Sequence, residues 1–510
     1  MKKALNILSL ILTLSLVFSF FSACGKNDQS DITQGQPSSA LQDQTNKEQG
    51  DRVLKLPYSN TEPLNPYKAT SLVNIQLAEL IYDPLFHLSK DYKPLACIAE
   101  KYTFENLSIF LDLKKGLVFS DSSPLKAEDI IHSFGLAKKS DIYGARLSSF
   151  AGVKKLSDHS LVFSLNRSNP YAANCLTFPI IKNGGKDDTP IGSGRYRLVE
   201  NKGKLELRAN ESRLGGFSPK QNKISLINIQ DSKTLSFALQ IGNIDFAYSD
   251  LSEGSYSRVN ANSHAVPLNN LVFLTFNHSN ALLRDPQVRK AIALLIDIQS
   301  ISENSFQGHA RPAYTPFNPD FYGGEKYKFQ PDPKAAEKAF EAAGFTKSSA
   351  GRAAASNYSK LKFDLLVNAD NPFKSDAAQK IAASLTSAGL AVNVTSLPFD
   401  QYIQAVKKGR FDIYIGEVAL TADMDLSPLL KAGGALSYGI DTYAGGAALA
   451  YKSFLEDGLD IEAFCRAFSD DLPFLPLGYR NALALYSRAL KTDKPCDMQD
   501  VFCKIEKWSF

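Results

Sequence analysis

Residues 361–418 alternate between short apolar runs and amphipathic helices, and this order restricts the fold more than any other part of the 510-residue sequence. Short apolar or alternating runs are typical of strands, whereas apolar residues at helical spacing indicate a helix. In chain order, the predicted strands and helices are residues 361–368, 376–388, 390–394, 400–408 and 411–418. Strands joined through helices in this way run parallel, because the crossovers are right-handed. The sequence therefore predicts an α/β fold with a parallel sheet.

Ligand contacts are expected where these strands end. Ligands of open parallel sheets bind outside the carboxyl ends of the strands, which here are residues 368–370 and 417–425. Asn368 ends the first strand. Glu417 shares a face of the last strand with apolar residues, and a carboxylate is costly to bury without a partner. We therefore predict that Glu417 contacts the ligand, with Asp423 as its substitute; the alternative is a structural ion pair between Glu417 and a nearby Lys or Arg.

The mixed pattern extends over the rest of the chain. Asp285-Pro286 and Asp332-Pro333 each offer an N-cap and a proline in the first helical turn. Residues 107–113 and 161–165 alternate with the period of a strand. A chain of this length is too long for one hydrophobic core, so we expect more than one domain.

The N-terminus has the features of an export signal. Lys2 and Lys3 precede an apolar run that ends with the small residues Ser22 and Ala23 before Cys24. This boundary resembles a bacterial lipobox, which predicts a signal peptide over residues 1–23 and a lipid on Cys24. A plain signal peptide and an uncleaved signal anchor are the alternatives.

The polar residues 24–52 lack the apolar surface that a folded segment buries and are predicted to form a flexible tether. The predicted location is the extracytoplasmic face of a bacterial cytoplasmic membrane, with the lipid as anchor.

The sequence shows no sign of an enzyme, and we predict no catalytic residues. It contains no G-x-S-x-G, H-E-x-x-H or phosphate-binding glycine loop.

The histidines do not fall at metal-ligand spacing, and the five cysteines after Cys24 match no zinc pattern; we expect no cofactor and no metal. A cation at Asp423 and Asp425 is a weaker alternative to a solvated loop or a polar ligand contact. The net charge of +4 excludes the basic footprint of a nucleic-acid-binding protein.

Six segments together resemble extracytoplasmic solute-binding protein family 5, the oligopeptide-, dipeptide- and nickel-binding lipoproteins of ABC importers. Residues 113–119, which read Leu-Lys-Lys-Gly-Leu-Val-Phe, and the following Pro-Leu-Lys-Ala-Glu-Asp-Ile of residues 124–130 are similar to one family motif. The other segments are residues 63–86, 191–196, 274–297, 332–345 and 473–477. They occur in the order of the family and cover residues 53–510.

The resemblance implies a two-lobed periplasmic-binding-protein-like fold of type II, cluster C, with a hinge and a ligand cleft between the lobes. On this basis lobe one comprises residues 53–270 and 471–510, and lobe two comprises residues 271–470. The implied function is the substrate-binding subunit of an ABC importer, which works by hinge closure with separate permease and ATPase subunits. A small solute is the implied ligand, and an oligopeptide is favoured. The alternatives are a secreted α/β hydrolase and a sensory or non-transport binding protein with the same fold.

The chain departs from the family at the end of the last predicted strand. Peptide-binding members often carry G-W-x-x-D there, and that Asp meets the peptide's amino group, whereas residues 416–420 read Gly-Glu-Val-Ala-Leu. Glu417 stands in the place of the Trp and Leu420 in that of the Asp, so Glu417 or Asp423 would have to supply the anion. Asn277, at the end of another family-like segment, and Asn368 complete the predicted ligand contacts.

Overall fold

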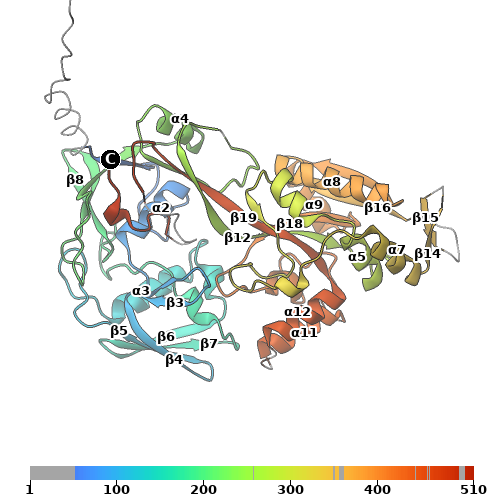
Figure 1. Cartoon of the computed structure of the whole chain (residues 1–510). Helices are drawn as coiled ribbons and strands as arrows, with labels where there is room; N and C mark the ends of the chain where they lie inside the picture. Colours follow the sequence, from blue (N-terminus) through green and yellow to red (C-terminus); the bar gives the residue numbers. More distant parts are fainter. Residues whose placement is uncertain are drawn as a thin grey trace, which may run out of the picture. The chain divides into compact units, whose positions relative to one another are not determined.

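The computed structural model describes residues 52–256, 258–348, 351–354, 361–442, 444–456, 458, 460–492 and 500–510. These residues form a mixture of helices and sheets (Figure 1), which confirms the predicted α/β class. The predicted signal peptide, Cys24 and Cys496 lie outside the described residues.

A seven-stranded sheet contains the unit that the sequence predicts at residues 361–418. Its order is β11-β19-β12-β18-β16-β17, and β13 also pairs with β19. β16 pairs in parallel with both β17 and β18, as predicted. β18 is antiparallel to β12, so the sheet is mixed rather than wholly parallel. The strands are β11 (Phe246–Ser249), β12 (Asn262–Phe276), β13 (Ala310–Arg311), β16 (Lys362–Asn368), β17 (Ala391–Leu397), β18 (Ile413–Ala419) and β19 (Phe474–Tyr486).

Side-chain caps fix the starts of two helices near this sheet. Asp285 accepts a hydrogen bond from the Gln287 amide at 2.8 Å, and Asp332 accepts one from the Ala335 amide at 2.9 Å, as the Asp-Pro pairs predict. These caps begin α5 (Pro286–Ala293) and α7 (Pro333–Ala342). α8 (Pro372–Ser387) begins four residues before the predicted residue 376.

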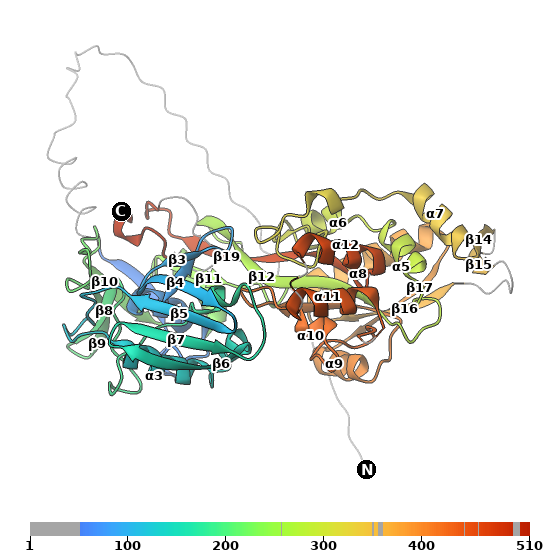
Figure 2. The same cartoon turned by 90° about the horizontal axis from the view of Figure 1, so that it is seen from below.

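Among the described residues, β12 and β19 are the longest strands, with 15 and 13 residues, and they pair with each other in antiparallel orientation. Figures 1 and 2 both show them side by side, reaching from the elements around β11 to those around β18. The predicted lobe boundaries near residues 270 and 470 fall within β12 and just before β19, and they stay a prediction.

Two smaller sheets and two hairpins come from other parts of the chain. One sheet has the order β1-β10-β9-β8 and the other has the order β4-β5-β7-β6. Their strands are β1 (Leu54–Tyr58), β10 (Lys223–Asn228), β9 (Lys204–Ala209), β8 (Tyr196–Asn201), β4 (Ala99–Glu105), β5 (Ser108–Leu113), β7 (Ser160–Leu165) and β6 (Phe150–Ser157). The hairpins pair β2 (Phe86–Leu88) with β3 (Pro94–Ala96) and β14 (Phe345–Ser348) with β15 (Gly351–Ala354). β5 and β7 confirm the strands predicted at residues 107–113 and 161–165.

The remaining helical segments connect or cover these sheets. The α-helices are α2 (Leu72–Ile81), α3 (Ala127–Ala137), α4 (Leu235–Gln240), α6 (Ile298–Ser300), α9 (Phe399–Lys407), α10 (Ser427–Leu430), α11 (Gly446–Glu456) and α12 (Ile461–Asp471). The short turns are η1 (Gly144–Leu147), η2 (Ala172–Cys175), η3 (Ser232–Thr234), η4 (Ile301–Ser305), η5 (Glu325–Tyr327) and η6 (Ile505–Lys507).

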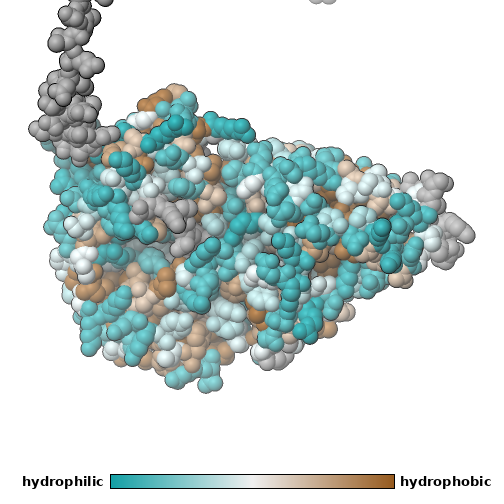
Figure 3. Space-filling model, viewed as in Figure 1, coloured by the Kyte–Doolittle hydropathy of each residue, from teal (hydrophilic) through white to brown (hydrophobic). Residues whose placement is uncertain are grey.

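Buried apolar side chains form separate clusters that follow the sheets. The largest surrounds the seven-stranded sheet, and two others accompany the sheets that contain β1 and β5. On the face drawn in Figure 3, hydrophilic residues predominate and hydrophobic residues form small separate groups. Among the described residues, no helix is both long enough and apolar enough to cross a membrane.

Candidate functional site

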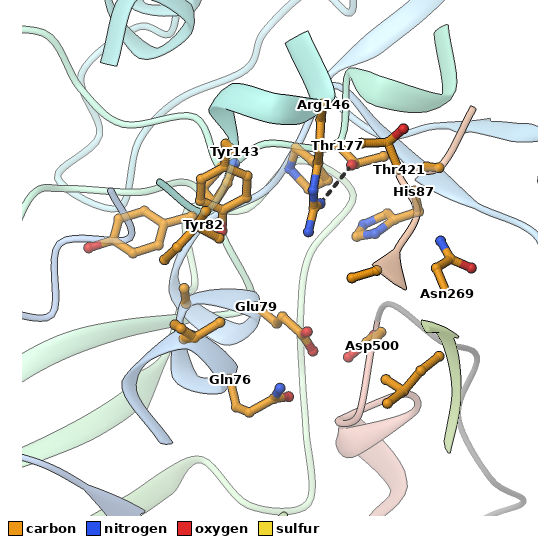
Figure 4. A pocket seen from close by; sticks show the side chains of 18 of the residues that line it. Gln76, Glu79, Tyr82, His87, Tyr143, Arg146, Thr177, Asn269, Thr421 and Asp500 are labelled. Atoms are coloured by element: carbon orange, nitrogen blue, oxygen red, sulfur yellow. Dashed lines mark hydrogen bonds between the residues drawn. The ribbon is translucent and has the colours of Figure 1, made fainter. Parts of the chain in front are cut away.

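A cavity of about 310 Å³ lies where α2, several loops, the middle of β12 and the end of β18 meet. α2 contributes Gln76 and Glu79, and the segment around η1 contributes Arg146 (Figure 4). On the opposite wall, residues 267–270 belong to β12, and residues 419–422 continue from the end of β18. Segments that are more than 300 residues apart in the sequence therefore share one cavity.

A partly buried group of charges forms one wall. The Arg195 guanidinium donates two hydrogen bonds to the Asp500 carboxylate, at 2.8 and 2.9 Å. Glu79 is beside them and accepts a hydrogen bond from the Val501 amide at 3.1 Å. Burial raises the pKa of the Glu79 carboxyl well above its ordinary value, and the negative charge of Asp500 adds to this effect while Arg195 opposes it. A cationic ligand group near Glu79 would favour its ionised form.

Arg146 supplies a positive group to the cavity. Its Nη1 atom is 3.5 Å from the Thr177 hydroxyl, at the limit of a hydrogen bond, and its guanidinium lies 5.1 Å from the centre of the Tyr143 ring. Figure 4 shows Arg146 between Tyr143 and His87. Within the described part of the chain, Arg146 forms no ion pair with a carboxylate. Its donors therefore remain available for an anionic group.

Gln76 supplies a neutral acceptor. The side chain is buried, and its Oε1 atom accepts no hydrogen bond from any described residue. A buried polar atom without a partner is costly, so such an atom in a cavity wall is expected to meet a ligand or water. By contrast, the Tyr82 hydroxyl already lies within hydrogen-bond distance of the Leu64 and Pro190 carbonyls.

This arrangement offers a cation on one side of the cavity and acceptors on another. A carboxylate suits the guanidinium of Arg146, because charged groups form the stronger hydrogen bonds. An N–H or ammonium group suits Gln76 and Glu79. The cavity can therefore select a small ligand that carries both kinds of group.

The comparison with known families decides what kind of protein this is. The family description "Bacterial extracellular solute-binding proteins, family 5 Middle" matches residues 96–433. The chain belongs to this family.

Relatives of this family 5 protein include characterised binding proteins. The oligopeptide-binding protein AppA of Bacillus subtilis (strain 168) is 23% identical over 442 residues, covering 81% of this chain and 79% of the relative. The glutathione-binding protein GsiB of Salmonella choleraesuis (strain SC-B67) is 25% identical over 310 residues, covering 56% of this chain and 60% of the relative. The crystal structure of an ABC transporter substrate-binding protein from Sinorhizobium meliloti superimposes with a TM-score of 0.72 at 19% identity, over 88% of this chain and 98% of that one.

These comparisons confirm the resemblance to family 5 and the two-lobed, periplasmic-binding-protein-like α/β fold. At the level of the family, they support a substrate-binding protein for a small solute or peptide rather than an enzyme. The family is extracellular, in agreement with the predicted extracytoplasmic location.

Glu417 occupies the end of β18 in this family 5 protein, but its carboxylate is engaged by protein side chains. Its oxygens meet Lys374 Nζ at 2.7 Å and Arg480 Nε at 2.6 Å, and Asn270 Nδ2 donates to it at 2.8 Å. Burial alone would raise the pKa of Glu417, but Lys374 and Arg480 outweigh it and lower the pKa to about 2. Glu417 is outside the cavity lining, although its partner Asn270 is part of it. This is the ion-pair arrangement that we gave as the alternative.

Asp423 is buried at a contact between distant segments. Its Oδ2 atom accepts a hydrogen bond from Asn169 at 2.7 Å, and the Thr421 hydroxyl bonds its other oxygen. Burial raises the pKa of Asp423. Nearby, Arg167 pairs with Asp425 at 2.8 Å. Asp423 does not line the cavity, but Thr421 does.

Asn277 and Asn368 have local partners and are not part of the cavity lining. Asn277 donates to the Phe411 carbonyl at 2.9 Å and accepts from the Ser279 amide at 3.0 Å. Asn368 accepts from the Asp370 amide at 3.0 Å and so closes a turn. The four predicted contacts are thus not gathered at the cavity, and their role in binding stays a prediction.

Sequence reasoning missed the charged residues that line the cavity. Glu79 gave a usable signal, since it is the only charged residue in the apolar helix α2. Arg146 and Asp500 gave none, because neither belongs to a recognisable pattern, and only the fold brings them to α2.

Proposed function

We propose that this protein delivers a small peptide, or a peptide-like solute with a free carboxylate, to an ABC importer. Its family membership supports the role of substrate-binding subunit. Two of its relatives are named for binding oligopeptides and glutathione, both of which carry carboxylates and amide or amino groups. Permease and ATPase subunits are the partners that this role requires.

One observation carries the ligand class. The Arg146 guanidinium, which forms no ion pair within the described residues, lines the same cavity as Gln76, whose Oε1 atom accepts no hydrogen bond from them. A carboxylate on Arg146 would gain a charge-assisted hydrogen bond, and Gln76 would gain the donor that it lacks. The cavity volume, about 310 Å³, is at the low end of the range of small-molecule sites. It therefore favours a short ligand over a long peptide.

Closure of the two predicted lobes is the proposed mechanism. Gln76, Glu79 and Arg146 belong to predicted lobe one, and residues 419–422 belong to predicted lobe two. A ligand that touches both walls binds the closed state more tightly than the open state, so it shifts the population towards closure.

We also propose that Cys24 carries the lipid that holds the protein at the membrane. The support is the sequence alone: a basic start, an apolar run and two small residues before Cys24. An anchored receptor stays near its permease, which raises its effective local concentration.

A thermal-shift screen tests the ligand class. The purified protein is heated with dipeptides and tripeptides as free acids, with the same peptides as C-terminal amides, and with sugars and metal chelates. We expect free-acid peptides to raise the melting temperature, because a ligand that binds only the folded state stabilises it, and their amides to do so weakly or not at all. Stabilisation by a sugar or chelate alone, with no effect of any peptide, would contradict the proposal.

A further inference from the structure

A second cluster of reactive side chains lies beside the ligand cavity. Asp83 follows α2, His87 is the middle residue of β2, and Cys97 follows β3. β2 and β3 pair so that Phe86 is opposite Ala96, and the Cys97 amide donates to the Leu85 carbonyl at 3.1 Å. Cys97 thus lies opposite Leu85, which is midway between Asp83 and His87 in the sequence. One ligand atom from each of the three side chains lies within 4.8 Å of the other two.

The cluster borders a separate cavity of about 240 Å³ that all three side chains line. Asp83 is buried, whereas His87 and Cys97 are partly exposed, so a small ion can reach them from this cavity. His87 also lines the larger ligand cavity, where Figure 4 shows it near Arg146. His87 therefore borders both cavities.

The three side chains differ in the number of hydrogen bonds that they already form. Asp83 accepts hydrogen bonds from Arg213, at 2.9 and 3.4 Å, and from the Ser193 hydroxyl at 3.4 Å. A carboxylate has about four acceptor sites, so it can hold Arg213 and a cation together. Within the described residues, neither the His87 ring nor the Cys97 thiol forms a hydrogen bond.

A neutral imidazole nitrogen and a thiolate sulfur are the forms in which these two side chains bind metals. A divalent ion at this cluster would therefore be held by the His87 ring, the Cys97 sulfur and the Asp83 carboxylate.

We propose that Asp83, His87 and Cys97 bind one zinc(II) ion, with the remaining coordination position open to the 240 Å³ cavity. Three protein ligands with mixed sulfur, nitrogen and oxygen donors and one open position suit zinc. Calcium and magnesium prefer oxygen donors alone, so the thiol disfavours them. The site is independent of the solute proposed above. The sequence could not reveal it, because the spacing 83, 87 and 97 matches no metal motif and the pairing of β2 with β3 creates the contact.

The test uses the full chain, reduced and stripped of metal, titrated with zinc chloride by calorimetry. We expect binding of one zinc ion per chain, measured as the stoichiometry of the titration. Cys97→Ser and His87→Gln should each weaken binding at least tenfold. Cys503→Ser and His159→Gln are the matched controls and should bind as the wild type does. Equal affinity in Cys97→Ser and in the wild type would overturn the proposal.

A spectroscopic measurement on the unmodified protein identifies the zinc ligands directly, so the test does not depend on whether the variants fold. X-ray absorption of the zinc-loaded chain should show one sulfur at about 2.3 Å and nitrogen or oxygen ligands at about 2.0–2.2 Å. With cobalt(II) in place of zinc, a thiolate-to-cobalt charge-transfer band should appear in the wild type and be lost in Cys97→Ser. A spectrum with only nitrogen and oxygen ligands, or a band that survives in Cys97→Ser, would refute the site.

Discussion

At the scale of single residues, Glu417 shows how a charge is placed at the edge of a binding cavity without facing it. Its carboxylate compensates Lys374 and Arg480, whose side chains are only 14% and 3% exposed. It also accepts a hydrogen bond from Asn270, which lines the cavity. The arrangement suggests that Glu417 organises the cavity wall through its neighbours.

Glu417→Gln is expected to lower stability, because it leaves two poorly exposed cations without their counter-ion. The expected loss in the free energy of unfolding at neutral pH is about 3 kcal/mol or more, the scale of an unpaired buried charge. Urea unfolding measures it, with Glu128→Gln, which removes one partner of a surface ion pair, as the control. An unchanged free energy of unfolding combined with weaker ligand binding would instead favour direct ligand contact by Glu417.

The same ion pair predicts a pH dependence. The pKa of Glu417 is lowered from 4.5 to about 2 in the folded protein, so its stabilising effect is complete above pH 4.5 and is lost as the pH falls towards 2. The difference in unfolding free energy between wild type and Glu417→Gln should therefore shrink over this range. A constant difference down to pH 2 would contradict the lowered pKa.

Cys24→Ala tests the lipid anchor. Cells that express the wild type should incorporate a labelled fatty acid into the protein, and cells that express the variant should not, because the proposed attachment is to the Cys24 thiol. Cys503→Ser is the control and should be labelled. Equal labelling of Cys24→Ala and the wild type would rule out this anchor.

At the scale of elements, the start of α8 shows what sequence reasoning overlooked. Asn371-Pro372 offers the same N-cap and proline as the pairs that begin α5 and α7, yet we placed the start at residue 376. Asn371 accepts from the Lys374 amide at 3.0 Å and also donates to the Ser252 carbonyl at 3.0 Å. The cap therefore joins α8 to the segment before β12.

Asn371→Ala should destabilise the protein by about 1–2 kcal/mol, the upper part of the range for an N-cap, because a second hydrogen bond is lost with the cap. Chemical denaturation measures the effect. Asp332→Ala removes the cap of α7, and within the described residues the Asp332 side chain forms no second hydrogen bond. This variant should therefore lower the free energy of unfolding by less than Asn371→Ala does. A larger loss for Asp332→Ala would contradict this reasoning.

Three of the predicted strands pack one side on a core. β5, β7 and β16 follow their apolar patterns, because burial of alternate residues fixes the period of a strand. The antiparallel pairing of β18 with β12 was not predictable, since it joins residues about 140 positions apart and no local pattern encodes it. The same long-range pairing brings Asn270 beside Glu417.

At the scale of the whole molecule, contacts between distant segments form the cavity. Arg167–Asp425 and Asn169–Asp423 join predicted lobe one to predicted lobe two next to the cavity residue Thr421. Sequence reasoning predicted a ligand edge at residues 417–425, and residues 419–422 line the cavity, while ligand binding there stays a prediction. It could not supply Arg146 or Asp500 from elsewhere in the chain.

Arg167→Gln is expected to weaken ligand binding without a large effect on folding, because its ion pair forms between the predicted lobes. Loss of about 0.5–1.5 kcal/mol corresponds to roughly 2–10-fold weaker affinity. Calorimetry with a ligand from the screen measures it, and Lys380→Gln, within a surface pair of α8, is the control. A lower free energy of unfolding with unchanged affinity would show that the pair is structural only.

The central claim is that Arg146 holds a ligand carboxylate, and calorimetry with matched ligands and variants tests it most directly. A peptide that binds the wild type is titrated as free acid and as C-terminal amide into wild type, Arg146→Gln and the exposed control Arg197→Gln. We predict that Arg146→Gln weakens binding of the free acid by about 1.5–3 kcal/mol, the scale of a hydrogen bond between charged groups, and changes binding of the amide little. Arg197→Gln should match the wild type with both ligands. Equal losses for acid and amide, or no loss for either, would contradict the account.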